Sequence, residues 1–183
     1  MDITSRWLKG LTQVELLTTV AIVGISTALA LPSLQGMQAK NAMSSNVNLF
    51  LAQLHLARSS AVTRGKRVTL CPTTNGTECN NDPKKWRDGY LVFEDTNSNR
   101  QRDSDEQIIS YQKNTTKEIR IVSSSRHRNR ISYIPLGRSW FSNTTVRFCH
   151  DKQPAYNRAI VISNTGKAQA LKTLRNGDAV TCD

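Results

Sequence analysis

Residues 9–34 read KGLTQVELLTTVAIVGISTALALPSL, and this stretch decides how the rest of the chain is interpreted. From Leu11 to Leu31 it has 21 residues, which extend about 30 Å as an α-helix. The hydrocarbon core of a bilayer has about that thickness. Glu15 is the only charged side chain between Leu11 and Leu31. The stretch therefore predicts a membrane-spanning helix, to which we assign residues 11–37.

A conventional secretory signal peptide is the alternative explanation for this apolar stretch. Residues 28–30, Ala-Leu-Ala, resemble the small-residue site at which such a peptide is cut. However, Glu15 lies near the start of the apolar stretch, where a carboxylate is costly. Gly10 and Leu11, which come shortly before Glu15, fit a different processing signal.

The segment Lys9–Leu17 resembles the class III signal of type IV pilins and pseudopilins. The resemblance implies that a prepilin peptidase cuts after Gly10 and methylates the new N-terminus at Leu11. Glu15 is then the fifth mature residue, which sets the filament register by pairing with the N-terminal ammonium of a neighbouring subunit. The resemblance also implies that Pro32 kinks the helix. Leu11 departs from the family pattern, in which Phe or Met is usual.

Beyond Gly36 the apolar residues recur every three or four positions, which predicts an amphipathic helix that ends near Thr63. Its apolar face comprises Met43, Val47, Phe50, Leu51, Leu54, Ala57 and Ala61. Gly65 suits the C-terminal cap of this helix.

Short segments typical of β-strands follow the helix, separated by Asn-Gly and similar turns. They are Arg67–Cys71, Gly89–Glu94, Gln107–Gln112, Ile119–Ser123, Ile131–Pro135, Thr145–Cys149, Arg158–Ser163 and Ala168–Leu174. One helix followed by antiparallel strands is an α+β arrangement, in which the apolar face of the helix packs on the sheet.

This second part of the chain resembles the GspH/FimT family of minor pilins and pseudopilins. The resemblance is carried by six segments: VTLCP at 68–72, WRDGYLVFED at 86–95, DEQII at 105–109, IPLGRS at 134–139, VRFC at 146–149 and IVISNTGK at 160–167. It implies the type IV pilin fold, in which a long N-terminal helix packs on antiparallel β-sheets.

Together the two resemblances divide the chain into a cleaved leader (1–10), a membrane and filament-core helix (11–37) and a head domain (38–183). They imply a minor pilin that contributes to pilus assembly or to the pilus tip. The alternatives are a DNA-binding minor pilin of natural transformation and a type II secretion pseudopilin. The expected partners are other major and minor pilins, the prepilin peptidase and the pilus assembly platform. We expect a single-pass inner-membrane protein with a periplasmic head, which later reaches the pilus at the cell surface.

All four cysteines, Cys71, Cys79, Cys149 and Cys182, lie after the helix. None forms a CxxC pair or has the spacing of a zinc site. An even number favours disulfides in an oxidising compartment. Cys71 and Cys79 flank a short turn, so they can pair locally, which leaves Cys149 with Cys182. The second bridge would hold the C-terminus on the sheet.

The chain carries 25 Lys and Arg against 14 Asp and Glu, a formal net charge of +11. A field of that sign favours polyanions: nucleic acid, anionic lipid headgroups or acidic partner subunits. Basic residues cluster at 64–67, 84–87 and 126–130 and in the C-terminal part of the chain.

DNA-binding members of the resembled family use a Gly-Arg-x-Arg motif, to which residues 166–169 correspond. Lys167 keeps the charge of the first arginine but not its fork geometry, and Gln169 is neutral. The motif is therefore only partly retained. The candidate DNA-binding residues are Lys167, Arg158, Lys172 and Arg175, which a hairpin is expected to bring onto one patch.

The segment Asp95–Glu106 places oxygen-bearing side chains at positions 1, 3, 5, 9 and 12 of a loop, as an EF-hand does. Arg100 occupies position 6, where an EF-hand has glycine, and the flanking residues predict strands. A polar hairpin loop explains the same residues, so no metal site is expected.

The sequence shows no arrangement typical of catalysis. His127 and His150 lie in basic loops without a clear Ser or Cys partner, and no phosphate-binding glycine loop is present. We therefore expect neither an enzyme nor a cofactor.

Overall fold

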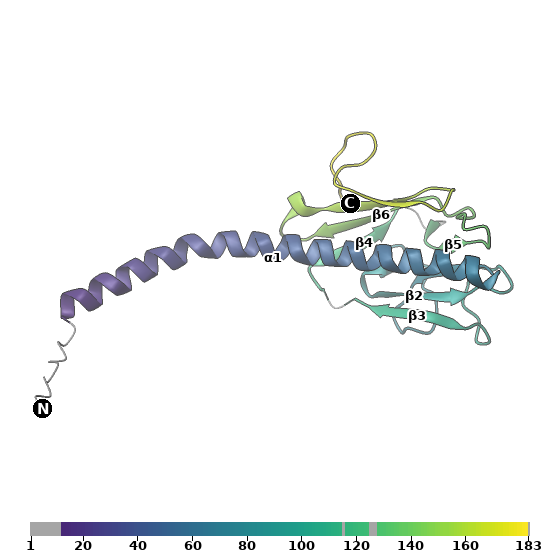
Figure 1. Cartoon of the computed structure of the whole chain (residues 1–183), viewed down its shortest axis with the longest axis horizontal. Helices are drawn as coiled ribbons and strands as arrows, with labels where there is room; N and C mark the ends of the chain where they lie inside the picture. The colour runs from purple at the N-terminus through teal and green to yellow at the C-terminus, as the bar shows by residue number, and fades with distance from the viewer. Residues whose placement is uncertain (1–11, 115, 125–127, 183) are drawn as a thin grey trace, which may run out of the picture. The chain divides into compact units, whose positions relative to one another are not determined.

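The computed structural model describes residues 12–114, 116–124 and 128–182, apart from the side chains of residues 28–33. In this part a long helix, α1, is followed by short strands (Figure 1). The chain divides into two units, Met1–Gln38 and Ala39–Asp183. The second unit, called the head below, contains all the strands that the structure describes.

Helix α1 (Gln13–Arg64) begins after a threonine that caps it. The Thr12 hydroxyl accepts a hydrogen bond from the backbone N–H of Glu15 at 3.2 Å, which satisfies one of the free donors of the first turn. The helix ends before Gly65, whose φ of 63° is the left-handed conformation of a C-terminal cap. Among the described residues, no helical segment combines the length and hydropathy needed to cross a bilayer.

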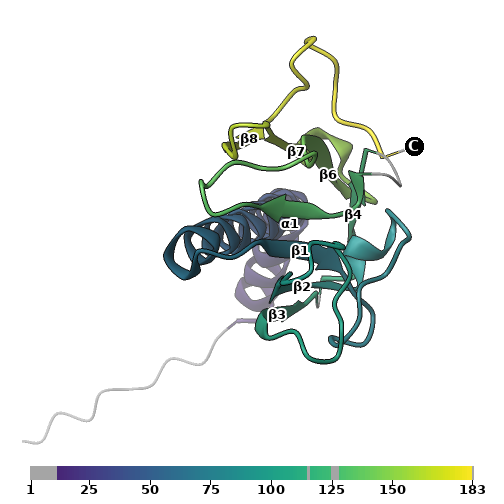
Figure 2. The same cartoon turned by 90° about the vertical axis from the view of Figure 1, so that its right-hand side faces the viewer.

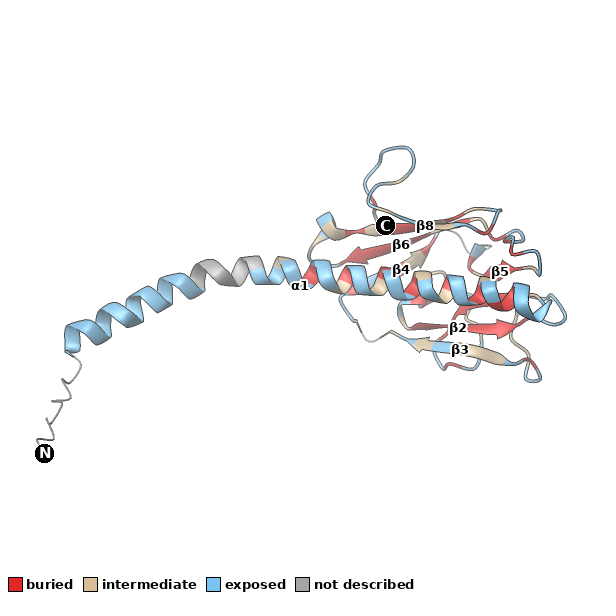
Figure 3. Cartoon of the chain, viewed as in Figure 1, coloured by how far each residue is buried: buried red, intermediate tan, exposed pale blue. Residues whose placement is uncertain are grey.

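Within the head, one side of α1 is buried and the other side is exposed (Figure 3). The buried residues are Ala39, Met43, Val47, Phe50, Leu54, Ala57 and Ala61. Six of these residues belong to the predicted apolar face, so the sequence pattern located the packed side of this helix correctly. Ala39 extends the face by one turn, and Leu51, which was expected in it, is only half-buried.

Two four-stranded antiparallel sheets cover this side of α1 in the described part of the chain. The first has the order β3-β2-β1-β5, with β1 (Val68–Pro72), β2 (Gly89–Glu94), β3 (Ile108–Lys113) and β5 (Ile131–Tyr133). The second has the order β4-β6-β7-β8, with β4 (Ile119–Ser123), β6 (Thr144–His150), β7 (Arg158–Ile162) and β8 (Ala168–Leu171). Seen end-on, strands β6 to β8 of the second sheet lie above strands β1 to β3 of the first, and α1 lies beside them (Figure 2). The predicted α+β class is confirmed.

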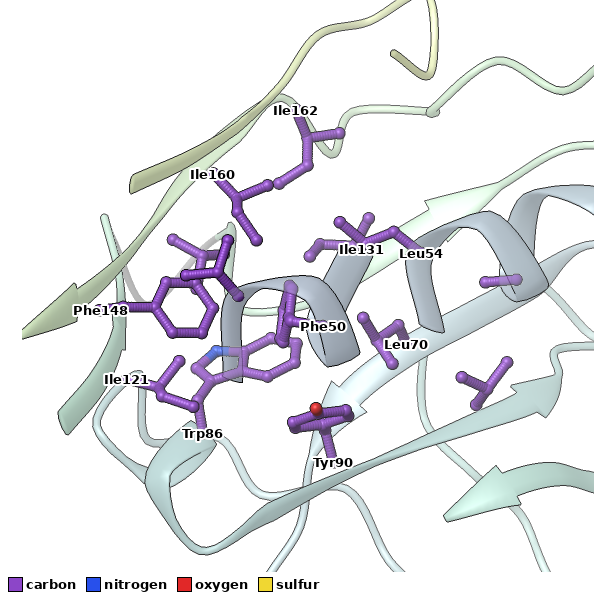
Figure 4. Close-up of a cluster of buried hydrophobic side chains, with 14 of the residues drawn as sticks. Phe50, Leu54, Leu70, Trp86, Tyr90, Ile121, Ile131, Phe148, Ile160 and Ile162 are labelled. Atoms are coloured by element: carbon purple, nitrogen blue, oxygen red, sulfur yellow. The ribbon is translucent and has the colours of Figure 1, made fainter. Parts of the chain in front are cut away.

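The core of the head is centred on Phe50 (Figure 4). Its ring meets Trp86, Tyr90 and Phe148 edge-on, with centroids 5.3, 5.0 and 5.5 Å apart. Trp86 belongs to the short 3-10 helix η1 (Lys85–Arg87), and its indole N–H donates a hydrogen bond of 2.5 Å to the side chain of Asn129. Helix and both sheets therefore share one aromatic cluster.

The topology gives the head two distinct ends. Helix α1 enters the head at Ala39. Only three residues separate the end of the helix from the start of β1, so β1 runs back towards the entry. The turn before β2 and the end of β3 therefore lie at this entry end, as does the start of β4. The far end carries the end of α1, the loop after β2, the loop after β5 and the turn between β7 and β8.

Candidate interaction surfaces

The N-terminal part of α1 exposes large apolar side chains on all sides. They are Val14, Leu16, Leu17, Val20, Ile22, Val23 and Ile25, and each is between 56% and 70% exposed. A helix that is apolar all round is normally surrounded by protein or lipid, and an exposed apolar surface of this kind marks an interaction site. This segment therefore needs a covering partner.

Glu15 lies in the first turn of this segment, where a carboxylate favourably meets the helix dipole. Within the described residues it takes part in no ion pair. Of the other residues singled out by the pilin signal, Gly10 and Leu11 lie outside the described residues. Pro32 falls within α1, but its side chain lies outside the described part.

The four cysteines form two disulfides, paired as expected from the sequence. Cys71 at the end of β1 is bonded to Cys79 in the following loop. Cys149 in β6 is bonded to Cys182. Cys149 and Cys182 also pack with Ala159 and Val180, so the bridge holds the C-terminal segment against the outer face of the second sheet.

The structure does not bring the four candidate DNA-binding residues onto one patch. Arg158 opens β7 and Lys172 follows β8, so they lie at the entry end. Lys167 lies in the turn at the far end, about 17 Å from Lys172 along β8. Arg175 lies beyond β8 and lines a polar hollow with Asn143 and Asn164. The single-patch expectation was wrong because the hairpin separates residues by their distance along its strands.

An exposed aromatic pair lies at the far end, in the loop between β5 and β6. The rings of Trp140 and Phe141 meet edge-on with centroids 5.0 Å apart, and Phe141 is 72% exposed. Phe141 has a φ of 47°, an unusual conformation for a bulky residue. Both rings line a small hollow together with Arg138 and Asn164. This pair was not predicted, because two adjacent aromatic residues in a sequence can be either buried or exposed.

Glu94 joins the end of α1 to the first sheet at the far end of the head. Its buried carboxylate accepts hydrogen bonds from the Arg64 guanidinium and, at 3.0 Å, from the Lys66 ammonium. Both bonds lower the pKa of Glu94 below its usual value, and the bond from Arg64 has the larger effect. The carboxylate is therefore held in its charged form as a clamp on the helix end.

The loop Asp95–Glu106 uses its oxygen atoms for hydrogen bonds within the protein. One oxygen of Asp95 accepts a bond of 2.9 Å from the Thr69 hydroxyl. The two oxygens of Glu106 accept bonds from the backbone N–H groups of Thr96 and Asp103, at 2.7 and 3.1 Å. In the described part of the chain, no group of three acidic, His or Cys side chains is placed to hold a metal ion. The loop has the internal bonding of a polar hairpin loop.

A family model matches most of the head. Residues 46–166, from the core of α1 to the turn after β7, match the family described as "Type II transport protein GspH". The chain belongs to the GspH family. This family includes minor pilins and pseudopilins, as the resemblance in the sequence implied. No curated protein matches the sequence.

Three solved structures are similar to this member of the GspH family. The minor pilin FimU of Pseudomonas aeruginosa matches in two crystal forms, with TM-scores of 0.55 and 0.50 and identities of 16% and 15%. The matches cover 72% and 74% of this chain, and 89% and 91% of FimU. The minor pseudopilin EpsH of Vibrio cholerae matches with a TM-score of 0.48 and 9% identity, over 70% of this chain and 94% of EpsH. The likeness to FimU confirms the type IV pilin fold.

Proposed function

We propose that this GspH-family chain is a minor pilin that assembles with other pilins into a type IV pilus. The observation that carries the proposal is the exposed apolar surface of α1 between Val14 and Ile25. A folded head joined to such a helix is suited to two environments in turn: a bilayer before assembly, and the packed helices of a filament afterwards. The role is structural and requires no catalytic residue.

Glu15 gives the proposed assembly a defined register. A carboxylate surrounded by apolar helices is costly unless it has a partner. The N-terminal ammonium of a neighbouring subunit, created at Leu11 when a prepilin peptidase removes residues 1–10, is a partner of suitable charge. The subunit is then stabilised only when it is correctly stacked. Before assembly, residues 11–37 would hold the chain in the inner membrane with its head in the periplasm, where disulfides form.

Incorporation of the chain into filaments tests this proposal. We expect a tagged chain to be recovered with filaments sheared from cells, and we expect Glu15→Ala to reduce that recovery strongly. Gln13→Ala, in the same exposed turn, is the matched control and should have little effect. Equal recovery of the Glu15 and Gln13 variants would contradict the register role. Loss of protein secretion with normal piliation in a deletion strain would instead favour the pseudopilin alternative.

DNA capture is a second candidate function, favoured by the exposed surface at the far end. Lys167 lies there together with Arg138 and the Trp140–Phe141 pair. Aromatic rings stack on the bases of single strands, and basic side chains contact phosphates. This surface replaces the patch expected from the sequence, since Arg158 and Lys172 lie at the other end.

A DNA titration of the full chain in detergent separates the two candidates. If the far end binds single-stranded DNA, Trp140→Ala should weaken binding by about 1–3 kcal/mol, the value of one stacked base. Lys167→Ala should reduce the log–log salt slope by about 0.7, and Gln169→Arg should strengthen binding by restoring the second basic residue of the motif. Lys172→Ala, at the entry end, is the control and should bind as the unaltered chain does. No binding even at low salt would exclude the DNA role and leave assembly alone.

A further inference from the structure

The entry end of the head carries a groove that the family assignment does not explain. We call it the entry groove. Its volume is about 650 Å³, and five basic side chains line it: Lys84, Lys85, Arg87, Lys113 and Lys117. Only two acidic side chains, Asp82 and Asp88, line it as well. The groove is therefore strongly positive.

Two chain segments that are distant in sequence supply the basic side chains of this groove. The turn before β2 supplies Lys84 to Asp88, and the end of β3 and the residues after it supply Lys113 and Lys117. The Arg87 guanidinium donates a hydrogen bond of 2.6 Å to the carbonyl of Lys117. The N–H of Asn114 donates to the carbonyl of Asp88 at 3.3 Å. These bonds hold the two basic walls next to each other.

The charges in the groove are largely unneutralised by the protein. Lys85 forms an ion pair with Asp88, at 3.3 Å between ammonium and carboxylate. Within the described residues, Lys84, Lys113 and Lys117 take part in no ion pair. All three are exposed. Like charges gathered in this way repel one another, so a ligand that supplies negative charge would stabilise the groove.

The groove lies close to the point at which the chain enters the head. The amide of Asn46 in α1 donates a hydrogen bond of 3.2 Å to the hydroxyl of Thr116, which is part of the groove lining. Asn46 lies about 10 Å along the helix from Ala39, the first residue of the head. If residues 11–37 are the membrane anchor, as proposed above, the groove lies at the end of the head that is joined directly to the anchor.

We propose that the entry groove binds the phosphodiester headgroups of anionic lipids and so holds the head at the membrane surface before assembly. This inference rests on the proposed membrane anchor. Anionic headgroups would supply the negative charge that the groove lining lacks. Each basic residue near an anionic bilayer surface raises the affinity about fivefold, and the attraction fades within a Debye length. Extraction of the subunit into a filament would then break these contacts.

Labelling of lysines in the full chain, reconstituted into vesicles, tests the inference. Amine reactivity is measured by mass spectrometry in vesicles of phosphatidylcholine alone and in vesicles that also contain phosphatidylglycerol. We expect Lys84, Lys113 and Lys117 to react about fivefold more slowly in the anionic vesicles, and high salt should remove the difference. Lys167, at the far end, is the internal control and should react equally in both.

A double variant, Lys113→Gln with Lys117→Gln, makes the test sharper. Both side chains are exposed, and the bond from Arg87 goes to the backbone of residue 117, so the head should fold normally. We expect Lys84 to lose much of its protection in this variant. Unchanged protection of Lys84 would contradict a shared lipid site.

The remaining outcomes overturn the inference in distinguishable ways. Equal labelling in both kinds of vesicle excludes lipid binding by the groove. Protection by inorganic phosphate in neutral vesicles assigns the groove to a soluble anion instead. Protection that needs added pilins assigns it to an acidic partner subunit. A chain that does not float with neutral vesicles lacks the proposed membrane anchor, whereas a chain that floats without protection refutes only the groove.

Discussion

A Cβ atom at Gly166 would lie 2.2 Å from the carbonyl oxygen of Gly137. The turn between β7 and β8 is therefore pressed against the loop after β5. The Ser139 hydroxyl, which donates a hydrogen bond of 2.6 Å to the carbonyl of Ser163, ties the same two segments together. This contact holds the turn that carries Lys167 against the loop that carries the exposed aromatic pair, so it shapes the surface that we consider for DNA.

Replacement of Gly166 by alanine should destabilise the head strongly. Gly166 has a φ of 83°, which strains any other residue, and the new methyl group would also meet the backbone of Gly137. Strain and overpacking together should cost about 2–5 kcal/mol. Gly177→Ala is the matched control, because Gly177 has a φ of 90° with nothing within 4 Å. It should cost only the strain, about 1–2 kcal/mol. Urea unfolding of the full chain in detergent measures both values, and equal losses would contradict the contact.

Phe50 should be the most sensitive position in the core. It is fully buried and meets three aromatic rings, so Phe50→Ala should lower the free energy of unfolding by about 3–5 kcal/mol. Leu49→Ala, the neighbouring exposed position, should change it by less than about 0.5 kcal/mol. Similar losses for the two variants in urea unfolding would show that α1 packs through a different face.

The two disulfides should contribute unequally to stability. Cys149 and Cys182 are 33 residues apart, whereas Cys71 and Cys79 are 8 apart. A longer closed loop restricts the unfolded chain more. Replacing Cys149 and Cys182 by alanines should therefore cost about 3.7 kcal/mol, and replacing Cys71 and Cys79 about 2.5 kcal/mol. Thermal unfolding of the two double variants compares them. A larger loss for the Cys71–Cys79 pair would contradict this loop-length account.

Glu94 should make the head more sensitive to acid. Hydrogen bonds from Arg64 and Lys66 lower its pKa in the folded state, so near pH 4 the unfolded chain binds more protons at this residue than the folded chain does. The stability from this clamp is complete above about pH 4.3, the ordinary pKa of a glutamate, and is lost as the pH falls through the lower folded value. Glu94→Gln should therefore lower stability at neutral pH and flatten the acid limb of the stability curve. The exposed Glu78 is the control, and Glu78→Gln should leave that limb as steep as in the unaltered chain.

The sequence predicted the elements of the fold well and their spatial grouping less well. The apolar spacing from Met43 to Ala61 located the buried face of α1, because helical periodicity is a local property. The strands were also predicted correctly, because strand-forming segments and the turn residues between them are local patterns too. The candidate DNA residues were grouped wrongly because their distance apart depends on the register of β7 and β8, which no local pattern states. The entry groove could not be predicted from the sequence for a related reason: Lys84 and Lys113 come together only through the pairing of β2 with β3.

Mass spectrometry of the chain recovered from sheared filaments tests the central claim most directly. The account predicts that the chain is present in small amounts relative to the major pilin and that it starts at a methylated Leu11. Filaments without the chain, from cells whose membranes contain it folded and disulfide-bonded, would contradict the account. A mature N-terminus after Ala30 would contradict it as well, because the helix that should enter the filament would have been removed.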